Sequence, residues 1–170
     1  VACEEEVRPL GDEGLALSRE IGWRAGEAFA LLVYHGMGLG ARGDYRAALP
    51  GTRQALAIAR AIDHPQWITA ARGILGCLHA DLGDWDVARR ELTSGLEQAQ
   101  AITSPYWTRS VTGWLVSALA HGGALNDAAA LLRDHHRDDV PFDTIAGRLL
   151  WSAAADLALA ENDPERALAT

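Results

Sequence analysis

The chain has 170 residues, of which 49% are hydrophobic and 22% are charged. This length supports one domain or one array of repeats with a buried core, and the composition excludes a disordered chain. The net charge of -8 lacks the basic surface that nucleic-acid binding requires. Charged residues interrupt every apolar stretch and no signal peptide is visible, so we expect a cytoplasmic protein with no membrane partner and no direct nucleic-acid contact.

The local composition predicts helices throughout the chain. It is rich in Ala, has only six Pro, and contains no run that alternates as a strand would. All fifteen basic residues are Arg, a usage typical of high-GC bacterial genomes. Two Cys are too few for a disulfide scaffold or a cysteine zinc site. We therefore expect an all-α protein.

The first 22 residues are interpreted as the second helix of a preceding repeat. Residues 15–21 match residues 56–62 at an offset of forty-one. Residues 23–62 then form the first full helix pair, with its turn at Gly43 and Asp44.

The second helix pair covers residues 63–102. Pro65 opens its first helix, where the missing N–H costs nothing. Gly83 supplies the left-handed residue that ends this helix, and Asp84 is expected to cap the next one. Spacings of three and four predict one buried stripe on that second helix, formed by Trp85, Ala88, Leu92, Gly95, Leu96 and Ala99.

The third pair covers residues 103–140 and the fourth, cut short, covers residues 141–170. Ser104 is expected to cap the first helix of the third pair, and Asn126 to cap a shorter second helix that ends near His136. Asp163 and the following Pro open the last helix. We therefore expect the chain to be a fragment of a larger protein.

Several anchors recur after forty residues and support this division. Residues 43–45 return as 83–85, and residues 62–67 return as 102–107. Single small residues keep the same spacing: Ala48, Ala88 and Ala128, and also Gly73 and Gly113. A fixed period of this length is typical of stacked helix pairs.

Helix pairs with Gly-Asp at the turn and small residues at fixed positions resemble the tetratricopeptide repeat. The matching positions of the second pair are Leu75, Gly76, His79, Ala88, Leu92 and Gly95. This resemblance covers nearly the whole chain and implies a right-handed α-α superhelix. The period of about forty exceeds the family norm of about 34. It is similar to the repeats in the C-terminal sensor regions of LuxR-type regulators related to the maltose activator, and of antibiotic-regulatory proteins.

The resemblance implies a non-catalytic binding module, the regulatory region of a bacterial transcription regulator. Its partner would be a protein, a peptide or a small-molecule inducer on the concave face. The alternative is a structural scaffold for protein assembly or self-association. In the family, first helices line the concave face, and carrying this over by position gives the candidate binding residues Arg24, Met37, Trp67, Gly73, Cys77, Trp107, Arg109, Gly113, Ser117 and Arg148. Tight helix crossing is the alternative role for the glycines, and bridging of neighbouring repeats is the alternative for the two tryptophans.

The remaining motifs favour neither a metal site nor an enzyme. His135 and His136, in the polar run 133–139, would point about 100° apart on a helix and so would not chelate one metal ion. Cys77 has apolar neighbours, and no base is placed near it by spacing. Phosphate-loop, zinc-helix and nucleophile-elbow motifs do not occur, so we expect no cofactor and no catalysis.

Overall fold

The structure is a computed structural model that describes the backbone of residues 3–135 and 141–170 and the side chains of residues 10–135 and 141–170. Helices account for most of these residues, and none of them forms a strand. The expected all-α class is therefore confirmed. The helices are α1 (Cys3–Glu20), α2 (Arg24–Ala30), the π-helix η1 (Leu31–Leu39), α3 (Tyr45–Ala61), α4 (Pro65–Asp81), α5 (Trp85–Ala101), α6 (Pro105–His121), α7 (Leu125–His135), α8 (Ile145–Ala160) and α9 (Pro164–Ala169).

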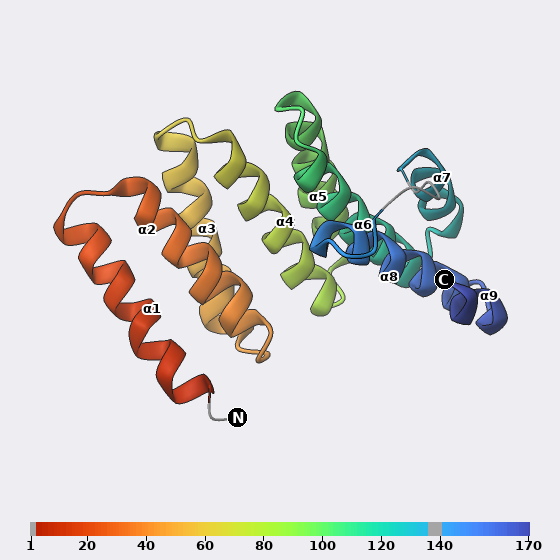
Figure 1. The fold of residues 1–170 in the computed structure, drawn as a ribbon, viewed down its shortest axis with the longest axis horizontal. Coiled ribbons are helices and arrows are strands. Elements are labelled where there is room, and N and C mark those ends of the chain that lie inside the picture. Colours follow the sequence, from red (N-terminus) through yellow and green to blue (C-terminus); the bar gives the residue numbers. More distant parts are fainter. Residues whose placement is uncertain (1–2, 136–140) are drawn as a thin grey trace.

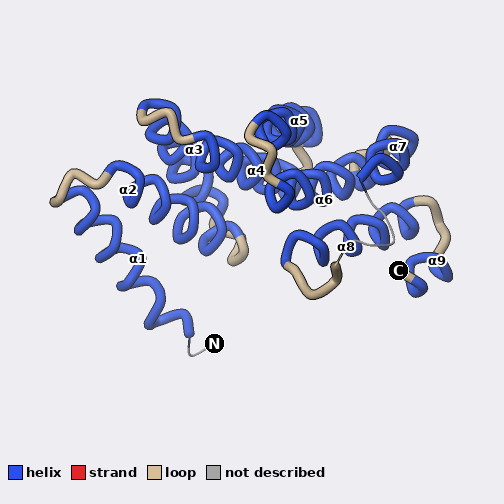
Figure 2. The backbone as a smooth tube through the Cα atoms, turned by 45° about the horizontal axis from the view of Figure 1, so that its top comes forward, coloured by secondary structure: helices blue, strands red, loops and turns tan. Residues whose placement is uncertain are grey.

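Successive helices run back and forth and pack against one another along the chain (Figure 1). In Figure 2, α3, α5 and α7 lie along one side of the molecule and α4, α6 and α8 along the other. Helix α6 contacts both of its neighbours on its own side, α4 and α8. The right-handed superhelix stays a prediction. The end of the predicted third pair, residues 136–140, and most of the polar run 133–139 lie outside the described residues.

Three glycines end the first helices of three pairs in the left-handed region. Gly43, Gly83 and Gly123 have φ angles of 78°, 75° and 82°. A residue with a side chain is strained in this conformation, whereas glycine is not. The turn predicted at Gly83 is confirmed, and the forty-residue spacing of these glycines is the spacing of the repeat.

Side-chain caps open the helices that begin with proline. The Ser104 hydroxyl accepts a hydrogen bond from the Trp107 amide at 3.4 Å, and His64 Nδ1 accepts one from the Trp67 amide at 3.3 Å. In the last helix, α9, the Asp163 carboxylate accepts a hydrogen bond from the Arg166 amide. The predicted cap at Ser104 is thus confirmed, and so is the helix predicted to begin at Asp163 and Pro164.

Two other predicted caps are wrong. Asp84 holds the N-cap position of α5, but its side chain accepts no cap hydrogen bond and instead lies 3.1 Å from His79 Nδ1. Asn126 lies inside α7, because Ala124 follows the left-handed Gly123 directly and its carbonyl accepts the first helical hydrogen bond. The start of α7 is fixed by the glycine turn, as it is after Gly43 and Gly83.

The core consists of small and aliphatic side chains at the helix crossings. The predicted stripe of α5 is buried at Ala88, Leu92, Gly95, Leu96 and Ala99. Trp85, which the pattern places on the same stripe, is 37% exposed beside the His121 ring. A Cβ at Gly76 would lie 2.3 Å from Leu92 Cγ, so α4 and α5 approach closely only because position 76 has no side chain.

The first helix of the first pair differs from its counterparts. Helices α4 and α6 are regular over 17 residues each, whereas the equivalent stretch is α2 followed without a break by η1. The repeat offset falls from forty-one before this stretch to forty after it, so the stretch contains one additional residue. A π-helix accommodates such an insertion without ending the helix. The sequence pattern had predicted no irregularity here.

Helix α8 packs directly on α6 through a glycine. A Cβ at Gly113 would lie 2.8 Å from the backbone of Leu149, so the two helix backbones are in contact there. None of the described helices is both long and apolar enough to cross a membrane.

Candidate functional site

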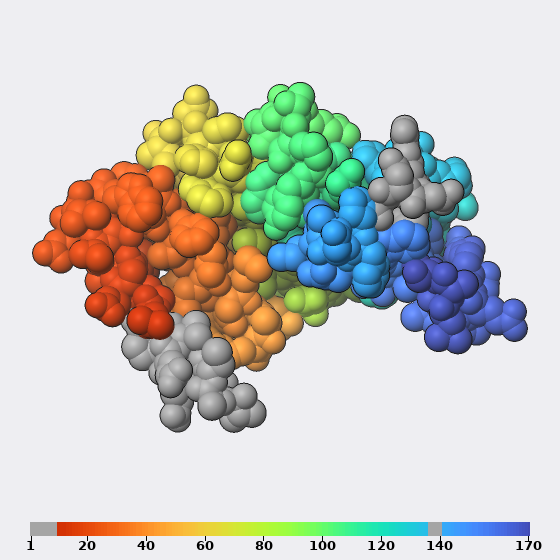
Figure 3. All heavy atoms as spheres, in the orientation of Figure 1, coloured from red at the N-terminus to blue at the C-terminus, as the bar shows by residue number. Residues whose placement is uncertain are grey.

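Half of the large apolar side chains that are exposed among the described residues lie at one end of the molecule, on α1, α2, η1 and the turn before α2. This end is the red and orange part of Figure 3, where α1 lies beside the following helix. Scattered exposed apolar residues are ordinary in proteins, but a contiguous group of them indicates an interaction site. The exposed group consists of Leu10, Leu17, Ile21, Trp23, Phe29, Val33 and Met37.

Six of these side chains border one hollow between α1 and the α2–η1 stretch, which we call the N-terminal hollow. It encloses about 350 Å³. Its walls are almost wholly apolar, and the hydroxyl of its serine, Ser18, already donates to the Gly14 carbonyl at 2.8 Å. The lining residues are Leu10, Gly11, Gly14, Leu17, Ser18, Ile21, Trp23, Gly26, Phe29, Ala30, Val33 and Tyr34.

Glycines give the hollow its shape. A Cβ at Gly11 would lie 2.6 Å from the Tyr34 ring, so the missing side chain lets this ring pack against α1. A Cβ at Gly26 would lie 2.2 Å from the Trp23 ring, which therefore lies flat over α2. Gly14 differs, because no atom lies within 4 Å of the position its Cβ would take. The backbone of α1 is thus bare where it faces the hollow at Gly14.

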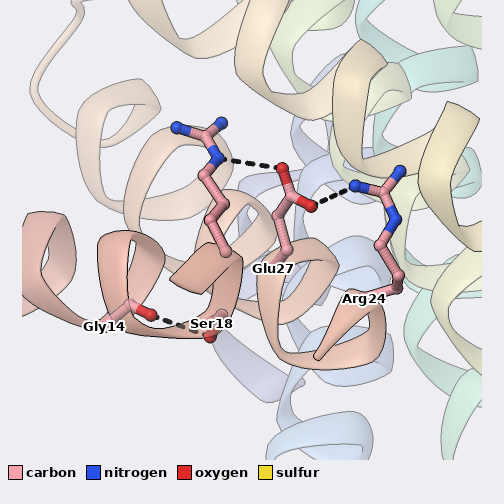
Figure 4. Close-up of polar contacts among 5 residues, drawn as sticks. Gly14, Ser18, Arg24 and Glu27 are labelled. Atoms are coloured by element: carbon pink, nitrogen blue, oxygen red, sulfur yellow. Dashed lines mark hydrogen bonds and ion pairs between the residues drawn. The ribbon is translucent and has the colours of Figure 1, made fainter. Parts of the chain in front are cut away.

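A buried carboxylate ties the two walls together. Glu27 of α2 is only 4% exposed, and its carboxylate accepts a hydrogen bond from Arg19 Nε of α1 at 2.9 Å and another from Arg24 Nη1 (Figure 4). Charge-assisted hydrogen bonds of this kind are stronger than neutral ones. Both arginine side chains are about half exposed, so the Arg19–Glu27–Arg24 cluster is a polar clamp that joins α1 to α2.

His35 of η1 lies at a second, smaller hollow on the side facing α3. Burial lowers the pKa of His35; Asp12 opposes this effect and Arg19 adds to it. Its Nε2 atom is buried and has no hydrogen-bond partner among the described residues. The ring is therefore neutral at physiological pH. This hollow, of about 340 Å³, is lined by Leu15, Arg19, Leu31, His35, Ala47, Pro50, Gly51 and Gln54.

The polar and thiol candidates from the sequence do not gather at one place. Arg24 belongs to the clamp between α1 and α2. Ser117 donates to the Asp156 carboxylate at 2.7 Å, and Arg148 donates to the Asp143 carbonyl at 3.2 Å. Arg109 is partly buried on α6. These candidates are spread over α2, α6 and α8.

The apolar candidates lie mostly at contacts between helices. Trp67 packs its ring against that of Phe29, with centroids 5.3 Å apart, and so joins α4 to α2. Trp107 packs against the core cluster formed by the preceding helices. Gly73 faces the Trp114 ring as Gly113 faces Leu149, so both glycines are buried at helix crossings. Met37 is exposed on η1.

Cys77 is a free, partly buried cysteine on α4. Burial, and after it the nearby charge of Asp81, raises the pKa of its thiol to about 12. Burial and then Asp81 also raise the pKa of Tyr45. Both groups are therefore neutral at physiological pH, and a neutral thiol is a poor nucleophile. In the part of the chain that the structure describes, no three His, Cys, Asp or Glu side chains are arranged to hold a metal ion.

Sequence reasoning missed the N-terminal hollow as a site, although it placed the nearby Arg24 and Met37 on the concave face. The available signal was the run of apolar residues on α1, since Leu10, Leu17 and Ile21 share one face at spacings of seven and four. What the spacing does not show is that none of the described helices covers this face.

Comparison with known proteins found no match: no protein-family model, no curated protein and no solved structure resembles this chain closely enough to assign it. The site therefore has to be interpreted from its own geometry.

Proposed function

We propose that this chain is a non-catalytic, tetratricopeptide-like module that binds another protein, and that the N-terminal hollow is its docking site. The observation that carries this proposal is the group of exposed apolar side chains around the hollow. Burying such side chains on binding contributes about 25 cal/mol per Å² of apolar surface removed from water. A contiguous exposed apolar group of this kind marks an interaction site.

A protein partner fits this hollow better than a small-molecule inducer does. Small-ligand sites combine apolar walls with a few polar groups that are free to form hydrogen bonds and so orient the ligand. Here the Ser18 hydroxyl is engaged by Gly14, and the Glu27 carboxylate is engaged by the two arginines of the clamp. The hollow therefore offers apolar surface but few free polar groups that could orient a small ligand. This favours the protein-assembly role over induction by a small ligand.

The repeat family and the biological setting belong to the same proposal. The forty-residue anchors, the left-handed glycines and the small residues at crossings support a tetratricopeptide-like array. The long period supports a place in the regulatory region of a bacterial transcription regulator acting in the cytoplasm. The neutral Cys77 and Tyr45, away from the hollow, support a binding rather than a catalytic role.

The proposal is tested by selecting peptides from a displayed random library on the immobilised chain. The counter-selection uses the variant Leu17→Glu, which places a charge in the hollow at a side chain that is 53% exposed and so is not needed for folding. We expect peptides that bind the wild-type chain and not the variant. Selection of no peptide that distinguishes the two proteins would contradict the proposed function.

A further inference from the structure

A hollow of about 390 Å³ lies between α3, α4 and α5, and we call it the α3–α5 hollow. Figure 1 shows the last turns of α3 and α5 and the first turns of α4 at the same end of the array. Helices of the chain flank this place on both sides, and it shares no lining residue with the N-terminal hollow. The lining residues are Arg60, Ile68, Arg72, Ser94, Glu97, Gln98 and Ala101.

The repeat shows that this surface stays open inside the array. Arg19 corresponds to Arg60 at the offset of forty-one, before the insertion in η1. Gln54 corresponds to Ser94 at the offset of forty, after it. Arg19 and Gln54 line the smaller hollow that His35 borders. The two hollows are therefore equivalent places on successive helix pairs, and none of the described helices fills either of them.

The backbone supports the offset of forty-one at this place. Gly22 and Asp63 are forty-one residues apart, and both are left-handed, with φ angles of 70° and 50°. Each lies in the turn that leads into the first helix of a pair, α2 or α4. The last turns of α1 and α3, with Arg19 and Arg60, therefore occupy equivalent positions.

The two hollows differ in one ion pair. In the first helix pair, Arg19 Nε donates to the buried Glu27 carboxylate at 2.9 Å. At the offset of forty-one, Ile68 stands in the place of Glu27. No described residue forms a hydrogen bond or an ion pair with the Arg60 guanidinium. Arg60 therefore keeps the position of Arg19 but lacks the carboxylate opposite it.

The polar side chains that α5 contributes to the hollow are also free. No described residue engages the Ser94 hydroxyl, the Gln98 amide or the Glu97 carboxylate. Free polar groups beside apolar side chains are typical of small-ligand sites, because they orient the ligand. The α3–α5 hollow thus has the feature that the N-terminal hollow lacks.

The charges at the hollow indicate a ligand that carries both signs. Arg72 Nη1 donates to the Glu91 carboxylate at 3.0 Å, so this pair is already neutralised. Among the described side chains that line the hollow, Arg60 and Glu97 are then left without partners, one of each sign. A simple anion would face both Glu97 and the net charge of -8. A zwitterion complements the two free charges.

We propose that the α3–α5 hollow binds a free aliphatic α-amino acid. Its carboxylate is held by Arg60, as Arg19 holds the Glu27 carboxylate in the first pair, through charge-assisted hydrogen bonds. Its ammonium group pairs with Glu97, and its side chain packs against Ile68. The inference goes beyond the proposed function and does not depend on it, because the α3–α5 hollow and the N-terminal hollow are separate.

The test is isothermal titration calorimetry of the 170-residue chain with L-leucine. Two analogues each lack one charge of this probe: 4-methylpentanoate has no ammonium group, and 3-methylbutylamine has no carboxylate. We expect saturable binding of L-leucine and binding roughly tenfold weaker, or less, for each analogue. Equal binding of 4-methylpentanoate would show a site for simple carboxylates and overturn the amino-acid assignment. No saturable binding of L-leucine would overturn the inference outright.

Arg60→Gln removes the charge that holds the ligand at an exposed side chain, so the fold is kept. We expect it to weaken L-leucine binding roughly tenfold or more. Arg90→Gln, at an exposed arginine of α5 outside the lining, is the matched control and should leave the affinity unchanged. Equal losses in the two variants would reduce the effect to net charge and overturn the role of Arg60. Leu17→Glu should bind L-leucine as the wild type does, so failure of this inference and failure of the proposed function are distinguishable.

A second pair of variants restores the ion pair of the first helix pair. Ile68→Glu places a carboxylate opposite Arg60, and Ile68→Gln has the same size without the charge. We expect Ile68→Glu to abolish L-leucine binding and Ile68→Gln to retain part of it, with circular dichroism confirming that both are folded. Equal affinities would overturn the inference, because residue 68 and the ligand would then not compete for Arg60. Ile68 is partly buried, so Arg60→Gln decides the question if these two variants do not fold.

Discussion

Glu27 is the residue on which the geometry of the candidate site depends most. Its carboxylate is buried, and it joins α1 to α2 through two arginines that solvent reaches on their outer side. If the two arginines were absent, the buried Glu27 carboxylate would destabilise the fold, because nothing would compensate for the desolvation of its charge. The position of α1 against α2 therefore depends on this cluster.

Replacing Glu27 by Gln keeps the shape of the side chain and removes its charge. We expect the free energy of unfolding to fall by about 1–2 kcal/mol, the scale of a hydrogen bond to a charged group. Urea denaturation followed by circular dichroism measures this change. Glu20→Gln, at an exposed glutamate on the same helix as Arg19, is the control and should leave stability unchanged. Equal effects of the two substitutions would show that the clamp contributes nothing specific.

His35 makes stability depend on pH. Because its pKa is lowered in the folded chain, the unfolded chain binds more protons as the pH falls below about 6.5. The free energy of unfolding should therefore fall as the pH is lowered from 7.5 to below about 6.5, the ordinary histidine pKa. We expect His35→Gln to lose less stability over this interval than the wild type, as measured by urea denaturation at both ends. His121→Gln, at an exposed histidine, should keep the wild-type dependence. If the stability of His35→Gln depends on pH as steeply as that of the wild type, the His35 ring does not cause this pH dependence.

At the scale of the helices, most boundaries follow from local chemistry that the sequence shows. Left-handed glycines end first helices at fixed spacing, and Ser104 and Asp163 cap where a proline follows. The π-helix η1 could not be predicted from the composition or from the hydrophobic periodicity. Its signal was the change of the repeat offset from forty-one to forty, which marks one inserted residue but does not say whether a loop or a helix absorbs it.

Two glycines in helices should respond to the same substitution in opposite directions. Gly113→Ala should lower the free energy of unfolding by about 1–3 kcal/mol, because its Cβ would meet the Leu149 backbone, which moves only if α8 moves. Gly14→Ala should raise it by up to about 1 kcal/mol, because α1 gains helix propensity and the Cβ meets nothing. Thermal or urea unfolding of the pair measures both. Destabilisation by Gly14→Ala would mean that α1 is already crossed at that point.

At the scale of the whole molecule, the stacking of helix pairs decides which apolar faces remain free. The sequence places Ile58 and Leu17 on equivalent faces and gives them equivalent residue types. Only the arrangement of the helices shows that η1 covers Ile58 and that none of the described helices covers Leu17. This is why the repeat and the helix pairs could be predicted from the sequence, whereas the N-terminal hollow could not. The predicted inner-face residues are distributed along the array, and Arg24 alone among them belongs to the clamp between α1 and α2.

The measurement that tests the central claim most directly is amide hydrogen–deuterium exchange of the chain with and without a peptide obtained from the library selection. Docking in the N-terminal hollow predicts added protection in α1 and in the α2–η1 stretch, over residues 10–34, and unchanged exchange in α4 and α6. Protection centred on Trp67, Gly73 and Trp107 would instead assign binding to the inner face of the array. That result, or no protection at all, would contradict the account.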